Sequence, residues 1–485
     1  MAARRAKRRS SALPVRTLGI MAVVVVLVLL LAAGVLGSVA RAGLYATGLY
    51  RDGGTPAVDP TVFHEASGRS TALPAQPSAP VLADASPEPG SRADAVASRI
   101  RDVGPVAGST WGMVVDAATG ETLFADRPDG DAIPASTLKV LTSLAALDIY
   151  GPDHRFDTKV LRDPADPAKL YLVGGGDPYL SKGPAGGPPA RSSILDLAAA
   201  TATALKDAGT PGDVEVVIDT SLFAGPGWNP DWIPVYRDYA AETSALWVDG
   251  ARPRGAAIGP RDANPSQVAA DAFTAELKRL GVGVSGTARG KAPADSAEVA
   301  KVSSMPVENI VELVLIYSDN DAAEVLFRHV GRAGGRTGSI TDGRAAIQET
   351  LQRLDAWTDG MKIVDGSGLS RANLVSARSL TRAVELAIKE DGERYRALAT
   401  GMSVAGTEGT LAGRFVEDGT APGRGLVRAK TGTLTNVHSL AGYVRSRDGS
   451  ILVYAFLVNG EQEEYRTRVW LDRITATLST CGCRG

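Results

Sequence analysis

The chain has 485 residues, of which 44% are hydrophobic and 22% are charged, and its formal net charge is −2. This composition is that of a globular protein, and the sequence contains no basic stripe that would indicate a nucleic-acid partner. The length exceeds that of one ordinary domain, so we expect at least two domains.

A basic segment followed by an apolar run opens the chain. Residues 1–16 carry six Arg and Lys side chains, whereas residues 17–40 carry no charge. At about 1.5 Å per residue, a helix over 17–40 spans a hydrocarbon core of roughly 30 Å, and the basic flank predicts a cytoplasmic N-terminus. A cleaved signal peptide is the alternative, because Ala40-Arg41-Ala42 has the small-x-small form. The apolar run exceeds the roughly 7 to 15 residues of a signal-peptide core, so we favour an uncleaved single-pass anchor.

Proline, alanine, serine and glycine dominate the next segment, which we assign to a linker over residues 41–92. Little of it can be buried to offset the entropy of ordering, and its prolines favour extended conformers. The linker should therefore hold the folded part away from the membrane, on the extracytoplasmic side. Release of the folded part by cleavage in the linker is an open alternative.

The first motif that suggests chemistry is Ser136-Thr-Leu-Lys139. Apolar stretches at 111–116 and 121–125 flank the turn AATG and predict a hairpin, and a helix should follow Pro134. Ser136 and Lys139 then share one side of this helix, where the amine can act as base if burial or a nearby cation lowers its pKa. For an isolated motif, a helix cap at Ser136 with a solvated Lys139 is the commoner explanation.

The second motif, Ser318-Asp-Asn320, lies between an apolar stretch at 310–317 and a helical pattern at 322–330. At such a break between helices, the Ser318 hydroxyl can relay a proton toward a leaving amine. The Asn320 amide can bind a substrate carbonyl and hold Lys139 in place. Alone, this motif is explained equally well as a helix cap.

The third motif, Lys430-Thr-Gly-Thr433, precedes two apolar strand patterns at 439–444 and 451–458, which predicts an edge-strand arrangement. Lys430 can supply a cation beside Ser136, and Gly432 permits close approach of a substrate backbone. The Thr431 and Thr433 hydroxyls can bind a carboxylate, and the Thr433 and Ser136 N–H groups form a natural oxyanion pair. A surface turn is the alternative for this motif alone.

Cysteine and histidine give no sign of a disulfide framework or a metal centre. Cys481 and Cys483 are too close in sequence for good disulfide geometry in most cases and cannot complete a metal site alone, so we expect a loose tail at 481–485. The sequence has four histidines: His64, His154, His329 and His438. They lack metal-ligand spacing, although His438 follows the third motif closely. No metal and no cofactor is predicted.

The three motifs in this order make the chain resemble a class C, low-molecular-mass penicillin-binding protein of the D-alanyl-D-alanine carboxypeptidase/endopeptidase family. The resemblance covers about residues 93–480 and includes four further segments: LVGGGDP (172–178), YAAETSALWVD (239–249), DGSGLSR (365–371) and GTEGT (406–410). It implies that Ser136 is the acylated nucleophile and Lys139 its base. It also makes Ser318 and Asn320 the second catalytic element, makes Lys430 the lysine of the third, and leaves residues 366–368 as a structural turn.

The resemblance implies an α/β (α+β) fold, a sandwich of antiparallel sheet and helices like that of serine β-lactamases and penicillin-binding-protein transpeptidase domains. The interval between the first two motifs is wide enough for one inserted domain, but shorter than in relatives that carry two nested ones. We place this smaller domain at 153–301, with helices at 192–206 and 266–280. The catalytic domain is then discontinuous, over 93–152 and 302–480, and closes with a helix at 463–478.

The implied function is that of a bacterial cell-wall hydrolase. Its substrates are the D-Ala-D-Ala ends of peptidoglycan stem peptides, or the D-amino-acid crosslinks between them, cleaved through an acyl-enzyme that β-lactams trap covalently. An extracytoplasmic catalytic region on the bacterial cell membrane agrees with this substrate.

Three other functions are weighed as alternatives. A class A β-lactamase-like hydrolase is disfavoured because no Glu between the second and third motifs has Asn four positions later. A G-x-S-x-G hydrolase is disfavoured because Asp365 stands where glycine is required before Ser367. A non-catalytic wall-binding scaffold is disfavoured because all three motifs are intact.

Overall fold

The computed structural model describes residues 91–184, 190–210, 212–253, 258–389 and 392–483. The predicted cytoplasmic segment at 1–16, the predicted anchor at 17–40 and nearly all of the predicted linker lie outside the described residues. Among the helices that are described, none combines the length and apolar character needed to cross a bilayer.

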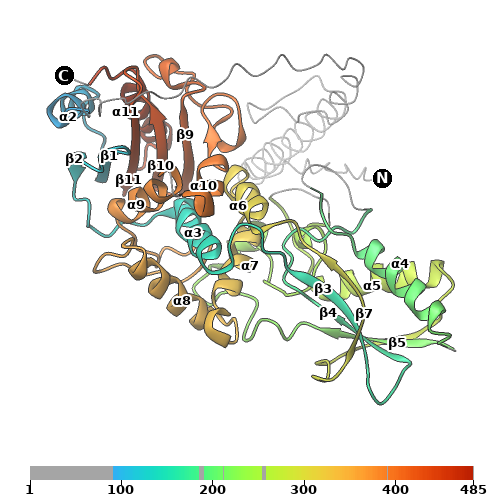
Figure 1. The fold of residues 1–485 in the computed structure, drawn as a ribbon. Helices are drawn as coiled ribbons and strands as arrows, with labels where there is room; N and C mark the ends of the chain where they lie inside the picture. Colours follow the sequence, from blue (N-terminus) through green and yellow to red (C-terminus); the bar gives the residue numbers. More distant parts are fainter. Residues whose placement is uncertain (1–90, 185–189, 211, 254–257, 390–391, 484–485) are drawn as a thin grey trace, which may run out of the picture. The chain divides into compact units, whose positions relative to one another are not determined.

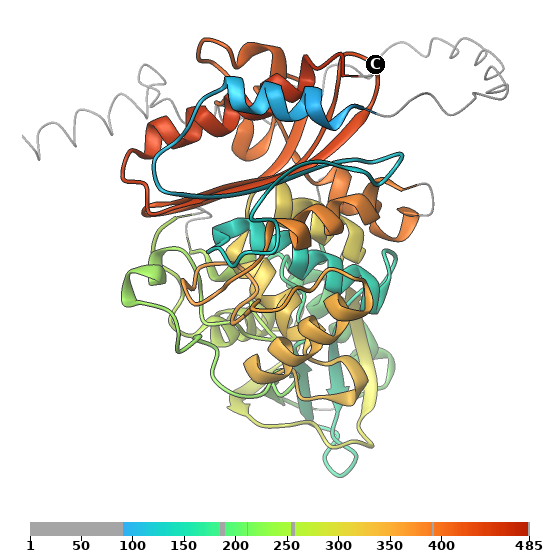
Figure 2. The ribbon, with the colours of Figure 1, turned by 90° about the vertical axis from the view of Figure 1, so that its left-hand side faces the viewer.

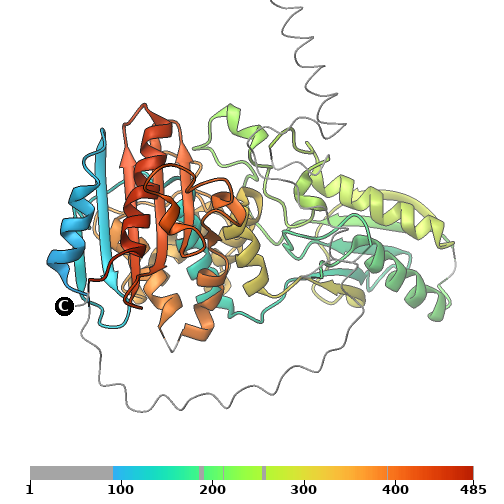
Figure 3. The same ribbon diagram turned by 90° about the horizontal axis from the view of Figure 1, so that it is seen from above.

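Six strands form an antiparallel sheet in the order β2-β1-β11-β10-β9-β8 (Figures 1 and 3). In chain order these are β1 (Ser109–Asp116), β2 (Thr122–Asp126), β8 (Ser403–Val404), β9 (Val427–Leu434), β10 (Val437–Arg445) and β11 (Ile451–Asn459). β1 and β2 form the predicted hairpin. Met113 on β1 lies opposite Ala455 on β11, so early and late parts of the chain share one sheet.

Side chains alternate between the two faces of this sheet, and each face is covered by helices (Figure 2). Val114 and Tyr454 belong to a core formed with α2 (Ala93–Asp102) and α11 (Glu464–Ser479). Met113 and Val453 belong to the core on the opposite face, where α9 (Ala377–Ile388) packs on the sheet. The final helix predicted at 463–478 is thereby confirmed as α11.

α3 (Leu138–Tyr150) is the central helix of the larger core and packs against four neighbours: α6 (Val307–Ile316), α7 (Asn320–Val330), α8 (Ile340–Arg353) and α9. Every residue from Leu138 to Asp148 is buried, as in a helix at the centre of a core. α6 and α7 confirm the helices predicted on either side of the second motif. The short helix α10 (Arg396–Thr400) precedes β8.

A second, mixed sheet is built from residues 157–303 in the order β6-β5-β4-β3-β7 (Figure 1). Its strands are β3 (Asp157–Arg162), β4 (Lys169–Val173), β5 (Val214–Asp219), β6 (Val284–Arg289) and β7 (Ala297–Ser303). α4 (Ile194–Asp207) and α5 (Pro265–Arg279) confirm the two predicted helices and share a core with this sheet. The sheet falls within the segment predicted as an insert, and its status as a separate domain stays a prediction.

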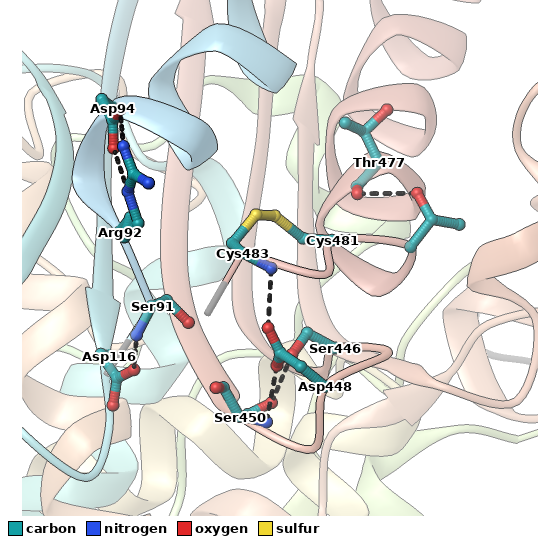
Figure 4. Close-up of a disulfide and its surroundings, with 11 residues drawn as sticks. Ser91, Arg92, Asp94, Asp116, Ser446, Asp448, Ser450, Thr477, Cys481 and Cys483 are labelled. Carbon is teal, nitrogen blue, oxygen red and sulfur yellow. Dashed lines mark hydrogen bonds and ion pairs between the residues drawn. A yellow bond between two sulfur atoms is a disulfide. The ribbon is translucent and has the colours of Figure 1, made fainter. Parts of the chain in front are cut away.

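The C-terminal cysteines do not form the loose tail that the sequence predicted. Cys481 and Cys483 are joined by a disulfide, with 5.1 Å between their Cα atoms, and both side chains are buried (Figure 4). The Cys483 N–H donates to Asp448 Oδ2 at 2.7 Å, and the Arg92 N–H donates to the Cys483 carbonyl at 2.7 Å. Contacts distant in sequence therefore order a segment whose composition alone gave no reason for order.

Candidate active site

Ser136 lies in a 3-10 turn, Ala135–Thr137, immediately before α3, rather than in the helix itself. Ala135 has a φ of +48°, a left-handed conformation that costs a non-glycine residue about 1–3 kcal/mol. The Ser439 hydroxyl of β10 donates to the Pro134 carbonyl at 2.6 Å and holds this turn against the sheet. The turn leaves Ser136 partly exposed at the start of a buried helix.

Two glycines allow other parts of the chain to approach this turn. A Cβ atom at Gly432 would lie 2.5 Å from the Pro134 carbonyl oxygen and 3.1 Å from the Ser136 nitrogen. A Cβ atom at Gly368 would lie 1.9 Å from the Ala135 carbonyl oxygen, and the φ of Gly368 is +83°. Both positions therefore require glycine for the Ser136 turn to sit where it does.

Lys139 links the first and second motifs. Its Nζ atom lies 3.0 Å from Ser136 Oγ, 2.7 Å from Asn320 Oδ1 and 2.6 Å from the Ser367 carbonyl oxygen. The side chain is completely buried. These three partners occupy all three N–H donors of an ammonium group, so the amine is held in one position.

Burial lowers the pKa of Lys139 to about 8. Four nearby carboxyl groups oppose the shift by favouring the ammonium form, namely those of Asp365, Glu324, Asp319 and Asp321. The desolvation cost of a buried ammonium exceeds this attraction. A substantial fraction of Lys139 is therefore neutral near physiological pH and able to accept a proton.

The second motif lies where α6 ends and α7 begins. Ser318 has a φ of +56°, and the Asp319 side chain caps α7 by accepting the Ala322 N–H at 3.1 Å. Asn320 is the first residue of α7, and its Nδ2 atom donates to the Tyr239 carbonyl at 3.0 Å. That contact fixes the amide orientation so that its oxygen faces Lys139.

The third motif forms part of β9. Lys430 is completely buried, and its Nζ atom donates to Ser318 Oγ at 2.9 Å and to the Thr431 carbonyl at 2.8 Å. Burial, and then the charge of Lys139, hold the pKa of Lys430 well below its ordinary value. The structure thus brings the three motifs together through two lysine side chains.

β9 presents an open edge beyond Ala429. Its outer neighbour β8 pairs only with Arg428 and Ala429, so no described strand covers residues 430–433 on that side. The Thr431 carbonyl faces this edge, since it accepts from Lys430, and the alternation of an antiparallel strand places the Thr433 N–H there as well. The Thr431 hydroxyl donates to Thr410 Oγ1 at 2.9 Å, within the GTEGT segment.

Comparisons with known proteins agree with this geometry. The model of the D-Ala-D-Ala carboxypeptidase 3 (S13) family matches residues 92–255 and 242–478. A carboxypeptidase of Mycobacterium tuberculosis is 31% identical over 429 residues, covering 87% of this chain and 92% of that protein. Carboxypeptidase DacB of Mycolicibacterium smegmatis is 32% identical, covering 82% of this chain and 86% of that protein.

The chain belongs to the D-Ala-D-Ala carboxypeptidase 3 (S13) family. The crystal structure of penicillin-binding protein 4 (dacB) from Haemophilus influenzae shares the fold, with a TM-score of 0.63 at 22% identity over 79% of this chain and 98% of that one. The predicted resemblance to class C, low-molecular-mass penicillin-binding proteins and the mixed α/β fold are confirmed. The protein is a serine-type D-alanyl-D-alanine carboxypeptidase, a hydrolase.

In this S13 enzyme, a buried acidic network lies next to Lys139, and none of the three motifs indicated it. Glu324 Oε1 accepts the Gly366 and Ser367 N–H groups at 2.9 and 2.7 Å. Asp365 accepts the Trp232 indole N–H at 2.9 Å, together with N–H groups of its own loop. The segment predicted as a structural turn therefore also supplies the Ser367 carbonyl to Lys139. One signal was available, because Glu324 follows Asn320 by four residues and shares its face of α7.

None of the three histidines in the described residues takes part in the hydrogen bonds that join the three motifs. His438 lies opposite Thr433 on β10, but the charged groups that influence it are Glu464, Arg414, Arg468 and Glu461, none of which belongs to a motif. Burial lowers the pKa of His438. Within the described ranges, no cluster of His, Cys, Asp or Glu has the arrangement of a metal site.

Proposed function

We propose that Ser136 attacks the carbonyl of the penultimate D-alanine in a peptidoglycan stem peptide, with Lys139 as its general base. The observation that carries this proposal is the contact of 3.0 Å between Lys139 Nζ and Ser136 Oγ. A neutral lysine has two N–H donors and one lone pair. If the donors bind Asn320 Oδ1 and the Ser367 carbonyl, the lone pair is directed at the serine hydroxyl.

In the acylation step, the Ser136 Oγ–C bond forms as its proton passes to Lys139 Nζ. The substrate carbonyl becomes an oxyanion, which the N–H groups of Ser136 and Thr433 are suited to bind. Collapse of this intermediate breaks the peptide bond and releases terminal D-alanine, leaving an ester on Ser136. Attack of water on the ester regenerates the hydroxyl and releases the shortened peptide.

The leaving amine requires a proton, and Ser318 is the residue we assign to deliver it. Its hydroxyl accepts from Lys430 Nζ at 2.9 Å, so a proton given to the amine by Ser318 can be replaced from Lys430. Lys139 then carries the proton taken from Ser136 and Lys430 is one proton short, so transfer of that proton from Lys139 to Lys430 restores both lysines. Asn320 keeps its role in orienting Lys139 and binding a substrate carbonyl.

Substrate binding is assigned to residues 431–433 on β9. An extended peptide can pair with the open edge of this strand, where Thr431 and Thr433 offer backbone groups and hydroxyls. The hydroxyls of these threonines, with Lys430 nearby, suit a terminal carboxylate. A β-lactam presents a similar carboxylate and a reactive amide, so it should acylate Ser136 and remain bound as the ester.

Carboxypeptidase and endopeptidase reactions share this chemistry and differ in the leaving amine. Terminal D-alanine leaves in the first reaction, and the crosslinked side chain of a neighbouring stem peptide leaves in the second. We propose both as activities of the same site, because the open edge of β9 does not by itself restrict the size of the group on the leaving side of the scissile bond.

A D-Ala-D-Ala carboxypeptidase finds its substrate in the cell wall, which supports an extracytoplasmic catalytic region. We propose that residues 17–40 anchor the chain in the bacterial membrane, that residues 41–92 act as a spacer, and that residues 153–301 form one domain inserted into the catalytic domain. The support is the apolar run of 17–40 with its basic flank, the proline-rich composition of the spacer, and the separate core of the second sheet.

The deciding experiment is the intact mass of the chain after incubation with benzylpenicillin, beside the Ser136→Ala variant. One adduct of the antibiotic's mass on the wild type, persisting for minutes and missing from the folded variant, is the expected result. Equal labelling of the variant would remove Ser136 from the nucleophile role. No adduct with intact antibiotic would favour the wall-binding scaffold, whereas no adduct with destroyed antibiotic would favour a β-lactamase-like hydrolase.

A further inference from the structure

Arg252 joins the two carboxylates on either side of Asn320. Its Nη2 atom lies 2.6 Å from Asp319 Oδ1 and 2.7 Å from Asp321 Oδ2, and its Nε atom donates to the same Asp321 oxygen at 3.1 Å. The two aspartates are 9% and 3% exposed. Buried charges of like sign are strongly unfavourable without a cation between them, and a planar guanidinium can bind both at once.

The turn that carries Arg252 is strained. Asp249, Gly250 and Ala251 have φ values of +50°, +62° and +56°, three left-handed residues in succession. L-residues adopt this conformation where their surroundings enforce it. Here the Asp249 N–H donates to the Leu180 carbonyl at 2.8 Å and its carboxylate binds Arg191 Nη2 at 2.6 Å.

The same segment contacts α7 at further points. Ala251 is buried in a small cluster with Val325 of α7, and the Ala241 N–H donates to Asp321 Oδ1 at 2.6 Å. The Tyr239 carbonyl accepts from Asn320 Nδ2. Residues 239–252, which include the YAAETSALWVD segment, therefore hold the first turn of α7 in place. They belong to the part of the chain, residues 157–303, that also forms the second sheet.

We propose that Arg252 is a positioning residue for acylation, which acts by fixing Asn320 against Lys139 and by balancing the carboxylates beside that lysine. The inference rests on the proposed roles of Ser136 and Lys139. It gives residues 239–252 a part in the reaction, although Arg252 itself contacts neither the nucleophile nor the base among the hydrogen bonds of the described residues.

The charges that face Lys139 come from three elements. Asp319, Asp321 and Glu324 belong to the start of α7, Asp365 to the loop behind it, and Lys430 to β9. Burial raises the pKa of Asp319, but Arg252, the Ala322 N–H and Lys139 together leave this pKa below its ordinary value. Burial and the Asp319 charge raise the pKa of Asp321, although Arg252 and Arg261 oppose them. Without Arg252, a carboxylate near Lys139 is no longer neutralised by a guanidinium, and its negative charge favours the ammonium form of the lysine.

The test is the rate of acylation by a fluorescent penicillin between pH 5.5 and 9.5, measured on the full-length chain. In Arg252→Gln, the half-point of the profile should move to higher pH by about half a unit to one unit, which is roughly a three- to ten-fold loss at pH 7. Arg252→Gln/Asp319→Asn removes the unbalanced charge while Asn can still cap α7, and should return the half-point to the wild-type value. Arg252→Lys should keep the half-point but react more slowly, because an ammonium does not bridge two carboxylates as a fork.

Arg378→Gln is the matched control, since Arg378 pairs with Asp129 on the surface of α9 and should leave the profile unchanged. A folded Arg252→Gln variant with the wild-type pH profile and rate would overturn the proposal. If that variant does not fold, Arg252→Lys with the wild-type rate would overturn it instead. A half-point that stays shifted in the double variant would overturn the charge-balancing part. Failure of the wild type itself to be labelled would instead reject the proposed function, and this inference with it.

Discussion

Lys139 and Ser367 are 228 positions apart in sequence, yet Lys139 Nζ donates to the Ser367 carbonyl at 2.6 Å. This contact fixes the amine from behind, while Ser136 and Asn320 approach it from other elements. Three partners from different elements thus fix the position of this amine, as its proposed role as base requires. It also makes the consequences of changing Lys139 specific enough to measure.

Lys139→Ala should remove acylation while the folded chain remains. Loss of a positioned general base costs about 10²- to 10⁴-fold in rate. The variant also leaves the Asn320 and Ser367 oxygens without their buried donor, at about 1–3 kcal/mol each, so a lower thermal midpoint is expected as well. Stopped-flow labelling with a fluorescent penicillin, on protein whose fold is checked by circular dichroism, measures both effects. Unchanged acylation kinetics would exclude Lys139 as the base.

Acylation should rise with pH and reach half of its maximum at about pH 8, because the reaction needs neutral Lys139 and burial lowers its pKa to about 8. Below that point the rate should fall about ten-fold per pH unit. The folded pKa lies below the ordinary value of 10.5, so the unfolded chain binds more protons between pH 8 and 10.5. This group therefore adds stability as pH rises through that window and not below it. A rate that stays constant from pH 6 to 9 would contradict the assignment.

Gly432→Ala should slow acylation by about a hundred-fold or more, because the new Cβ would lie 2.1 Å from Ser439 Oγ and 2.5 Å from the Pro134 carbonyl oxygen. The turn that carries Ser136 must move away from β9, and small displacements at a reacting centre cost about 10²-fold. Gly286→Ala on β6 is the matched control, since a Cβ there meets no atom within 4 Å. Equal rates for the two variants would show that the close approach at Gly432 is not required.

Local patterns in the sequence were sufficient for much of this structure. The hairpin at β1 and β2 and the helices α4, α5, α6, α7 and α11 follow from periodicity and turn residues. Contacts between distant segments were not accessible in the same way. The left-handed Ala135 depends on β10 and on Gly368, so the predicted helix begins two residues after Ser136. The partners of Lys139 from residues 365–367 required the tertiary fold, although the DGSGLSR segment is recognisable in the sequence.

Cys481 and Cys483 also depend on contacts that local sequence patterns do not predict, since their burial arises from α2 and the β10–β11 turn. Closing so short a ring should contribute only about 1–2 kcal/mol by the chain-entropy model. The stronger expectation is local: in the Cys481→Ser/Cys483→Ser variant, amide hydrogen exchange should increase in α2, which begins directly after the Arg92 to Cys483 bond. Amides of α5, in the other sheet's core, provide the internal control. Unchanged exchange throughout α2 would show that the disulfide does not secure this end of the chain.

Glu324 gives a prediction about stability rather than rate. Burial, and then the charge of Asp365, raise its pKa to about 8, so the folded chain keeps a proton on Glu324 that the unfolded chain loses above its ordinary pKa of 4.5. The contribution of this group to stability is therefore complete below pH 4.5 and declines as pH rises toward 8, by up to roughly 1.4 kcal/mol per unit.

Glu324→Gln has the same shape and no such proton, and its side-chain oxygen can still accept the Gly366 and Ser367 N–H groups. We expect the variant to gain stability relative to wild type as pH rises from 5 to 8, measured by thermal midpoints at pH 5, 6.5 and 8. Asp365, which accepts four hydrogen bonds in this network, is unchanged in the variant. If the thermal midpoints of wild type and variant change in parallel from pH 5 to 8, Glu324 is already ionised in the folded chain. Its charge would then stabilise the ammonium form of Lys139 at every pH where the enzyme works.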